Sequence, residues 1–406
     1  MDKCLLILGA GFEQIKSYQI AKELGLQIVG TDINPLAQSF KFADYKIIAS
    51  TYDIKSTIEA TLKFHKTVRP INGVICVGTD ITLTMASVAD ALNLPSISIE
   101  TATLATDKLA MKQKLAADDI PVPWFSKIES VDQLNNIISN SEKHFVLKPI
   151  DSRGSRGVIR LTQDINTDWA FQESLKYSPS RCLILEEFLP GPQVSTESIV
   201  VDGVAYTSGF ADRSYEFLDI YAPFFIENGG DLPSNLPLDQ QKTILNLMQR
   251  GADCIGVKNG IVKGDIVVHD GVPKIIELAT RLSGGFFCTH LIPLNCGVDL
   301  VTAAIKMAMG ETISIEDIKP KFNRYVSQRW IFPTPGNIVS IQGIEEARRI
   351  EGIREILISA KIGDKVEPPQ NSNASIGSII ATGESREQAL AIVKQALRII
   401  KVETKL

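Results

Sequence analysis

The N-terminal part of the chain alternates short apolar runs with helix-like segments, and this alternation limits the fold more than any other feature. Apolar runs at 4–10, 27–33, 45–50 and 73–78 predict buried strands, and residues 96–98 predict a weaker fifth strand. Helical patterns fill the intervals between these runs. Strands separated by helices form βαβ units, so we expect an α/β domain built on a parallel sheet.

Further along the chain the pattern shifts toward strands that are joined by turns. A helix is expected at 106–117, and residues 193–310 are rich in strand-like runs. Within this region the dipeptide Asp270-Gly271 suits the type I′ turn of a β-hairpin. A closing helix is expected near 385–400, because its apolar residues recur on one face at helical spacing.

Composition narrows the class of function. The net charge is −5 and the charges are interleaved without a Lys/Arg run, so nucleic acid is not an expected partner. No stretch reaches roughly 18 apolar residues and no signal-peptide pattern is present, so we expect a cytoplasmic protein without a membrane span. The cysteines form no C-x-x-C pair and are expected to be reduced thiols. They are Cys4, Cys76, Cys182, Cys254, Cys288 and Cys296.

A first glycine motif, Gly9-Ala10-Gly11, follows the first predicted strand. Asp32 ends the second strand, at the spacing typical of a dinucleotide-binding turn. However, Gln14 stands where the third glycine of that pattern belongs. The favoured interpretation is therefore a tight strand-to-helix turn that binds no dinucleotide, and an NAD-dependent oxidoreductase is the alternative.

A second glycine motif follows Lys148, at the end of a predicted strand. The loop 152–157 combines glycines, serines and arginines. Glycines let backbone N–H groups approach phosphate oxygens closely, and the cations offset the phosphate charge. The motif is not a Walker A loop, because its lysine precedes the glycines. A solvated basic loop explains the same residues.

Two carboxylates flank the predicted hairpin turn at nearly equal distances. Asp265 lies before the turn and Glu277 after it, so the two side chains are expected to be neighbours across the ladder. Paired carboxylates that act together with substrate phosphates suit Mg²⁺. Arg281 lies four residues after Glu277 and could stabilise a transferring phosphoryl group. Two ordinary surface carboxylates are the alternative.

A strand that runs into a hinge at 185–191 offers backbone groups to the edge of an adenine ring. Downstream, Gln193, Ser195 and Glu197 alternate onto one face of the next strand, where they would line a cleft or face solvent. A plain strand end is the alternative for the hinge.

Taken in order, these segments resemble the ATP-grasp superfamily. The resemblance covers Asp107-Lys108, then the loop after Lys148, the hinge, and the two carboxylate strands. It is closest to the L-amino acid ligases, a carboxylate–amine ligase branch that makes dipeptides and carries stretches like 224–233 and 297–300. The segment 363–389 is similar to the C-terminal lobe of these ligases and of biotin carboxylases.

The resemblance implies a mixed α/β and α+β protein with the ATP-grasp fold. A Rossmann-like pre-ATP-grasp domain would come first. A small lobe with the glycine loop as a lid, a large lobe with the magnesium site and a mixed α+β lobe would follow. The four units are expected at 1–105, 106–190, 191–320 and 321–406.

The same resemblance assigns the site residues. Lys108 and Lys148 would hold the ATP phosphates, Asp265 and Glu277 the metal, and Arg281 an acyl phosphate. The remaining ATP-binding residues would be Ser152, Arg153, Gly154, Ser155, Arg156, Gly157, Glu186, Glu187, Phe188, Leu189 and Gln193. Gln193 replaces a ribose-binding glutamate of many relatives, and Ala279 replaces an asparagine that usually contacts a second metal ion.

Some further residues are substrate-binding candidates. They are Glu197, Arg213, Glu216, Glu227, Gly284, Gly285 and His290. Each has a simpler explanation: Arg213 and Glu216 as a surface pair, Glu227 as a solvated acid, and His290 as a core histidine.

The implied enzyme activates a carboxylate as an acyl phosphate, with Mg-ATP or Mn-ATP, and transfers the acyl group to an amine. Both substrates would be small molecules; neither biotin nor NAD is expected, and a homodimer is the default assembly. Three alternatives remain at this point. They are a purine-pathway or bicarbonate-using ATP-grasp enzyme, a nucleotide-binding protein with a decayed site, and the oxidoreductase.

Overall fold

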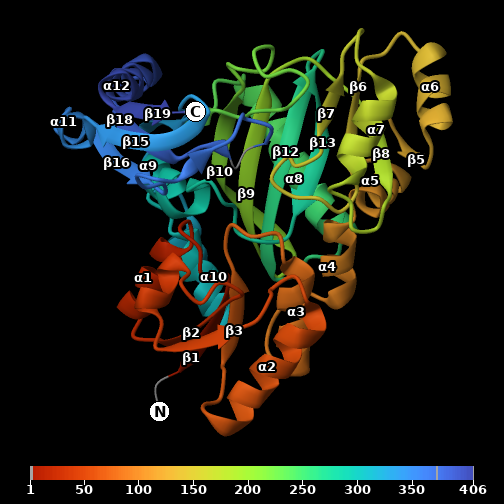
Figure 1. Ribbon diagram of the computed structural model, residues 1–406. Coiled ribbons are helices and arrows are strands. Elements are labelled where there is room, and N and C mark those ends of the chain that lie inside the picture. The colour runs from red at the N-terminus through yellow and green to blue at the C-terminus, as the bar shows by residue number, and fades with distance from the viewer. Residues whose placement is uncertain (1–2, 372–373, 406) are drawn as a thin grey trace.

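The computed structural model describes residues 3–371 and 374–405, so two residues of the segment 363–389 lie outside it. Figure 1 shows the N-terminal domain below a broad central sheet, with a smaller lobe at one side and the C-terminal region at the other. The predicted mixed α/β architecture is confirmed. Within the described residues, no helix combines the length and apolarity that crossing a membrane requires.

The N-terminal domain is built on a parallel sheet with the strand order β3-β2-β1-β4. Its elements are β1 (Cys4–Leu8), α1 (Ile15–Glu23), β2 (Gln27–Asp32), the 3₁₀ segment η1 (Gln38–Phe42), β3 (Tyr45–Ile48), α2 (Ile54–Thr67), β4 (Gly73–Cys76), α3 (Thr82–Ala91) and α4 (Ile99–Thr106). The predicted fifth strand at 96–98 is wrong. Ser98 instead accepts a hydrogen bond from the Thr101 N–H and caps α4, because its hydroxyl satisfies a helix N-terminal donor.

The small lobe has an antiparallel sheet in the order β5-β8-β6-β7, which carries the glycine loop between β6 and β7. Its elements are α5 (Lys108–Ala117), β5 (Phe125–Ile128), α6 (Val131–Ser139), β6 (Phe145–Pro149), β7 (Ile159–Leu161), α7 (Thr167–Leu175) and β8 (Leu183–Glu187). The predicted helix at 106–117 is confirmed as α5. Its N-terminus is capped by Asp107, whose carboxylate accepts the Leu109 and Ala110 N–H groups.

The large sheet has the order β13-β12-β9-β10-β11-β14-β18-β16, so it continues from the large lobe into the C-terminal region. The large-lobe elements are β9 (Gln193–Val201), β10 (Val204–Ser214), β11 (Gly229–Leu232), α8 (Leu238–Cys254), β12 (Gly260–His269), β13 (Val272–Ala279), the π-helical turn η2 (Phe287–Leu291), α9 (Ile292–Cys296), α10 (Leu300–Ala308) and the 3₁₀ turn η3 (Ile315–Ile318).

The C-terminal region adds strands to this sheet and forms a small sheet of its own, in the order β17-β15-β19. Its elements are β14 (Tyr325–Ile331), β15 (Gly336–Gln342), α11 (Ile344–Arg348), β16 (Ile353–Ile358), β17 (Lys365–Val366), β18 (Gly377–Gly383), α12 (Arg386–Ile399) and β19 (Lys401–Lys405). The predicted closing helix is α12, which buries Ala389, Val393 and Ala396.

The predicted hairpin of β12 and β13 is confirmed. Asp270 and Gly271 both have positive φ angles, 50° and 76°, as a type I′ turn requires. The strands pair in a register that sets Asp265 opposite Glu277, with an irregularity directly after Asp265. The turn chemistry therefore fixes which two carboxylates meet.

The largest apolar core joins the N-terminal domain to the large lobe. It includes Leu5 and Ile7 of β1, Leu300 and Ile305 of α10, and Val326 of β14, each almost fully buried. A parallel bridge between the segments after β4 and β13 adds a direct backbone connection. The turns that follow β1 and β4 are thereby fixed beside the end of β13.

Candidate functional site

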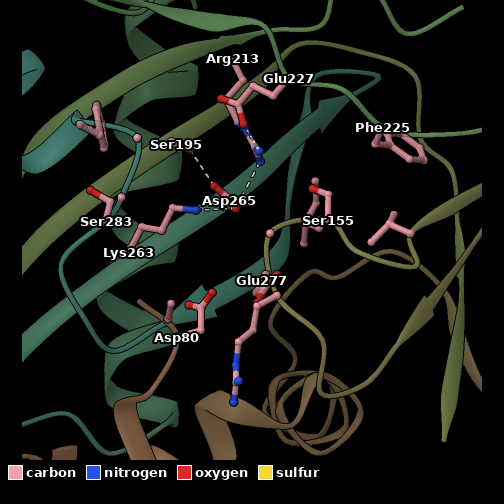
Figure 2. Close-up of a pocket in the computed structure, with 18 of the residues that line it drawn as sticks. Asp80, Ser155, Ser195, Arg213, Phe225, Glu227, Lys263, Asp265, Glu277 and Ser283 are labelled. Atoms are coloured by element: carbon pink, nitrogen blue, oxygen red, sulfur yellow. Dashed lines mark hydrogen bonds and ion pairs between the residues drawn. The ribbon is translucent and has the colours of Figure 1, made fainter. Parts of the chain in front are cut away.

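A cavity of about 660 Å³ lies where the N-terminal domain, the small lobe and the large sheet meet. Figure 2 shows Asp80, Ser155, Arg213 and Asp265 turned toward this space from separate segments of the chain. Most of the expected ATP-binding and metal-binding side chains line it. They include Lys108, Lys148, Ser152, Arg153, Gly154, Ser155, Arg156, Glu186, Glu187, Phe188, Leu189, Gln193, Asp265 and Glu277.

Asp265 is held by three side chains: Lys263 of its own strand β12, Ser195 of the neighbouring strand β9, and Arg213 of β10. Ser195 donates a hydrogen bond of 2.7 Å to Oδ1, while Lys263 at 2.6 Å and Arg213 at 3.2 Å contact Oδ2. Burial alone would raise the pKa of Asp265, but the charges of Arg213 and Lys263 outweigh it and hold the pKa well below its ordinary value. The Asp265 carboxylate is therefore held in place and ionised.

Glu277 joins strand β13 to the small lobe. Its Oε1 lies 3.1 Å from the Lys108 ammonium nitrogen, and Lys108 also donates to the Ser152 carbonyl at 2.9 Å. Burial would lower the pKa of Lys108, but the carboxylates of Glu277 and Asp80 raise it above its ordinary value. Lys108 is thus a permanent cation between the carboxylate pair and the glycine loop.

The carboxylate pair fits a hard divalent cation. Asp265 and Glu277 face one another across the ladder and both reach the cavity. Among the described residues no cluster of three or more His, Cys, Asp or Glu side chains is arranged to bind a metal. The protein would therefore supply two carboxylates, and ATP phosphates and water would supply the other oxygen ligands, as is usual for Mg²⁺.

Lys148 and Glu186 form a cluster with a third residue that the sequence pattern did not single out. Lys148 donates to Glu186 Oε2 at 2.7 Å, and Lys112, from α5, approaches the same oxygen at 3.4 Å. Lys112 is completely buried. Its position on the helix that begins with Lys108 was the only available signal, because a lysine in a helix usually faces solvent.

The glycine loop contacts Tyr52 of the N-terminal domain and Lys108 of α5. Gly154, Ser155 and Gly157 have φ angles of 60°, 60° and 73°, a left-handed conformation that favours glycine. The Arg153 guanidinium lies over the ring of Tyr52, 4.3 Å from its centroid, so the loop reaches the N-terminal domain. The loop therefore lines the cavity between the small lobe and the N-terminal domain.

Another wall of the cavity is formed by the hinge, with the apolar side chains of Phe188 and Leu189. The backbone N–H groups of Glu187 and Phe188 donate to the carbonyls of Trp124 and His144, at 2.8 Å each. These two donors are consequently used within the protein. Gln193 lines the cavity where a ribose contact was expected.

Arg281 is oriented by the N-terminal domain. Its Nε donates to Asp80 Oδ1 at 2.7 Å, and an Nη group contacts the same oxygen. Burial would raise the pKa of Asp80, but Arg281 lowers it below its ordinary value. The sequence analysis missed Asp80, although its place just after a predicted parallel strand was a usable signal, because ligands bind at the carboxyl ends of such strands.

A second acid of the N-terminal domain, Glu13, also reaches the cavity. Its Oε2 accepts a hydrogen bond of 2.8 Å from the Gly285 N–H, and burial raises its pKa. A side chain at Gly284 would place its Cβ 2.7 Å from this oxygen and 3.2 Å from the Gly78 Cα. The glycines after Arg281 therefore allow two distant turns to meet around Glu13.

The substrate-binding candidates separate into two groups. Arg213 contacts Glu227 at 2.5 Å, and both line the cavity, as do Gly284 and Gly285. The alternative of a surface pair between Arg213 and Glu216 is wrong, because Glu216 contacts Arg329 at 3.5 Å instead.

The other candidates lie behind the cavity wall. Glu197 is fully buried, and its two oxygens accept the N–H and hydroxyl of Ser283. His290 contacts the Thr289 hydroxyl at 2.8 Å, and burial lowers its pKa to about 4. These contacts are those of packed interior groups.

The N-terminal glycine turn is filled by the chain itself. Asp32 accepts the N–H groups of Ala10 at 3.0 Å and Asn34 at 2.9 Å, and Gln14 donates to the Val77 carbonyl at 2.8 Å. Tyr18 also donates to the Gly9 carbonyl. These contacts support the interpretation of this motif as a structural turn.

Comparison with known families agrees with the fold. Residues 105–285 match the model of the ATP-grasp domain, and residues 329–405 match L-amino acid ligase C-terminal domain 2. The chain therefore carries an ATP-grasp domain and an L-amino acid ligase C-terminal domain, and the ATP-grasp ligases, L-amino acid ligases among them, form carbon–nitrogen bonds. The second match relates it more specifically to the L-amino acid ligases, and both parts of the expected resemblance are confirmed.

Individual relatives are distant. The chain is 24% identical to an L-arginine-specific L-amino acid ligase of Bacillus subtilis, over 73% of this chain and 72% of the relative. It is 23% identical to a formate-dependent phosphoribosylglycinamide formyltransferase of Saccharolobus solfataricus, over 99% and 98%. The crystal structure of an L-amino acid ligase from Bacillus licheniformis superposes with a TM-score of 0.85 at 18% identity, and covers 100% and 99% of the two chains.

Proposed function

We propose that this protein joins the carboxylate of one small molecule to the amine of another and converts ATP to ADP and phosphate. The observation that carries the proposal is the convergence of Asp265, Glu277, Lys108 and Arg281 on one cavity. The L-amino acid ligase C-terminal domain supports amino acids as both substrates, and hence a peptide-type product.

The reaction would proceed in two steps. A carboxylate oxygen of the first substrate attacks the γ-phosphorus of ATP, the bond to the bridging oxygen breaks, and ADP leaves. The amine nitrogen then attacks the acyl carbon, phosphate leaves with the bonding electron pair, and the nitrogen loses a proton. The product is an amide. Each step mainly requires positioning and charge neutralisation.

The residues of the cavity match these requirements. Lys108 and Lys148 would neutralise the ATP phosphates, and Arg281 would stabilise charge on the acyl phosphate and on the oxyanion that follows. Asp265 and Glu277 would hold Mg²⁺, or alternatively Mn²⁺, which supplies further neutralisation of the phosphates when bound. The glycine loop would act as a lid and exclude water, which otherwise hydrolyses the acyl phosphate.

The proposal extends to the four structural units of the chain, its location in the cell and its oligomeric state. The units 1–105, 106–190, 191–320 and 321–406 act as the nucleotide-fold domain, the lid lobe, the metal lobe and the C-terminal lobe. The reaction takes place in the cytoplasm and uses no biotin. A homodimer is the proposed assembly, and light scattering on the purified chain tests it.

Release of ADP and phosphate tests the central proposal. Mg-ATP is supplied with a panel of single and paired amino acids, and the Glu277→Gln variant is measured beside the wild type. Glu311→Gln is the matched control, because Glu311 forms an exposed ion pair with Lys3. Release of ADP that requires a pair and disappears only in Glu277→Gln supports the ligase, whereas release of AMP or no binding of ATP contradicts it.

A purine-pathway reaction is the second candidate. The end-to-end similarity to the phosphoribosylglycinamide formyltransferase favours it. The same assay with formate and phosphoribosylglycinamide distinguishes the two. ADP release with this mixture, and with no amino acid pair, would select the second candidate.

A further inference from the structure

Lys112 has no direct access to the cavity, yet it lies against a residue that does. Its side chain is fully buried on α5, and its ammonium group has no hydrogen-bond partner among the described residues. The nearest opposite charge is the carboxylate of Glu186, 3.4 Å away. Glu186 and Lys148 both line the cavity. Lys112 can therefore influence a ligand only through these two residues.

Burial of a lysine without hydrogen bonds is costly, so the position calls for an explanation beyond packing. Glu186 shares one oxygen, Oε2, between Lys112 and Lys148. Two positive charges and one negative charge leave the cluster with a net charge of about +1, by the ordinary charges of these side chains. Without Lys112, the buried Glu186 carboxylate would cancel the charge of Lys148.

We propose that Lys112 is a positioning residue for ATP. Lys112 neutralises the Glu186 carboxylate from the side away from the cavity, so that Lys148 keeps its positive charge for the nucleotide phosphates. This inference rests on the proposed use of ATP. Lys112 touches neither ATP nor the reacting atoms, and it acts only through Glu186 and Lys148.

The device has a pH dependence. Burial, with a smaller contribution from Lys148, lowers the pKa of Lys112 to about 8, although Glu186 opposes the shift. The other nearby charge is Glu277 on β13, which is already paired with Lys108. Lys112 therefore loses its proton in free protein just above neutral pH. Bound phosphates favour the protonated form, so ATP binding is expected to take up a proton near pH 8.5.

Calorimetric titration of Mg-ATP at pH 7 and pH 9 tests the inference. Because only the protonated form favours ATP, the Kd of the wild type should rise by up to about tenfold between these pH values. Lys112→Arg keeps its charge and should bind equally at both. Lys112→Met should bind about tenfold more weakly than the wild type at pH 7, the loss expected for one nearby charge at a partly buried site, and about as tightly as the wild type at pH 9.

Lys114→Met provides the matched control. Lys114 lies on the same helix but is exposed and pairs with Asp118, so this variant should reproduce the wild type at both pH values. Titrations at pH 8.5 in buffers of different ionisation enthalpy measure the proton uptake directly in unmodified protein, which does not depend on how any variant folds.

The outcomes are distinct. ATP binding by the wild type that is independent of pH, with no proton uptake, overturns the role of Lys112 and leaves the ligase proposal intact. A Lys112→Met variant that binds ATP as tightly as the wild type at pH 7 overturns it as well. If the wild type binds no ATP at either pH, the proposed function itself fails.

Discussion

Asp80 accepts two hydrogen bonds from the guanidinium of Arg281, across 201 positions of the sequence. The ion pair joins the turn after β4 to the segment after β13. Backbone contacts reinforce it, because the Gly78 N–H donates to the Leu282 carbonyl at 3.0 Å. The N-terminal domain therefore orients the cation expected to stabilise the acyl phosphate.

Replacing Asp80 with Asn should lower kcat more than it raises KM. The amide keeps the size of the side chain but loses the charge that fixes Arg281, and a small misplacement in a site of this kind costs up to about 100-fold in rate. Steady-state kinetics for ATP and both substrates measure the split. Asp80→Glu should recover part of the rate.

Asp44→Asn is the control for this substitution, since Asp44 forms a more exposed ion pair with Lys22 in the same domain. It should keep the wild-type kcat. An Asp80→Asn enzyme with unchanged kcat would show that Arg281 does not need this partner.

The pairing of Asp265 with Glu277 could be predicted from the sequence, whereas the other acids of the cavity could not. Asp265 and Glu277 flank a single hairpin turn, and turn chemistry with a strand period of two fixes their register locally. The place of Asp80 after a predicted strand was a local signal, but the position of Asp80 and Glu13 in this cavity depends on the packing of the N-terminal domain against the large lobe, which is a long-range relationship. Lys112 was hidden because its burial depends on the neighbouring lobe.

Two predictions were wrong because contacts formed in the fold outweigh the local sequence pattern. Residues 96–98 alternate serine with isoleucine, which is a weak strand pattern, but the hydroxyl of Ser98 caps a helix, and the cap outweighs the weak strand propensity. Arg213 was considered with Glu216, which is close in sequence. The structure pairs it with Glu227, because the chain turns back between β10 and β11.

Ala279 offers a gain-of-function test of the metal site. It lines the cavity on the strand that carries Glu277 and lies opposite Lys263. Ala279→Asn would add an amide oxygen of the kind that binds Mg²⁺, so half-maximal activity should require a several-fold lower Mg²⁺ concentration. Ala279→Val adds volume without an oxygen and should not lower it. Equal Mg²⁺ requirements in Ala279→Asn and wild type would mean that this position does not reach the metal.

The lid should depend on Tyr52. Its ring carries the Arg153 guanidinium, and cation–π contacts at exposed sites contribute about 0.5–1 kcal/mol. Tyr52→Ala should therefore raise the KM for ATP roughly two- to fivefold and increase the ATP hydrolysed per amide formed, because water enters more often. Tyr52→Phe keeps the ring and should resemble the wild type. Identical coupling in Tyr52→Ala and Tyr52→Phe would assign lid closure to other contacts.

His290 should make the protein less stable in mild acid. Burial lowers its folded-state pKa to about 4, from an ordinary value of 6.5. The unfolded chain therefore binds the proton first as the pH falls, and the free energy of unfolding decreases between these two values. The loss by pH 5 is about 2 kcal/mol. Denaturant unfolding at pH 8 and pH 5 measures it in the wild type and in His290→Gln, which cannot titrate. The variant should lose about 2 kcal/mol less than the wild type over this interval, and an equal loss in both proteins would place the acid sensitivity elsewhere.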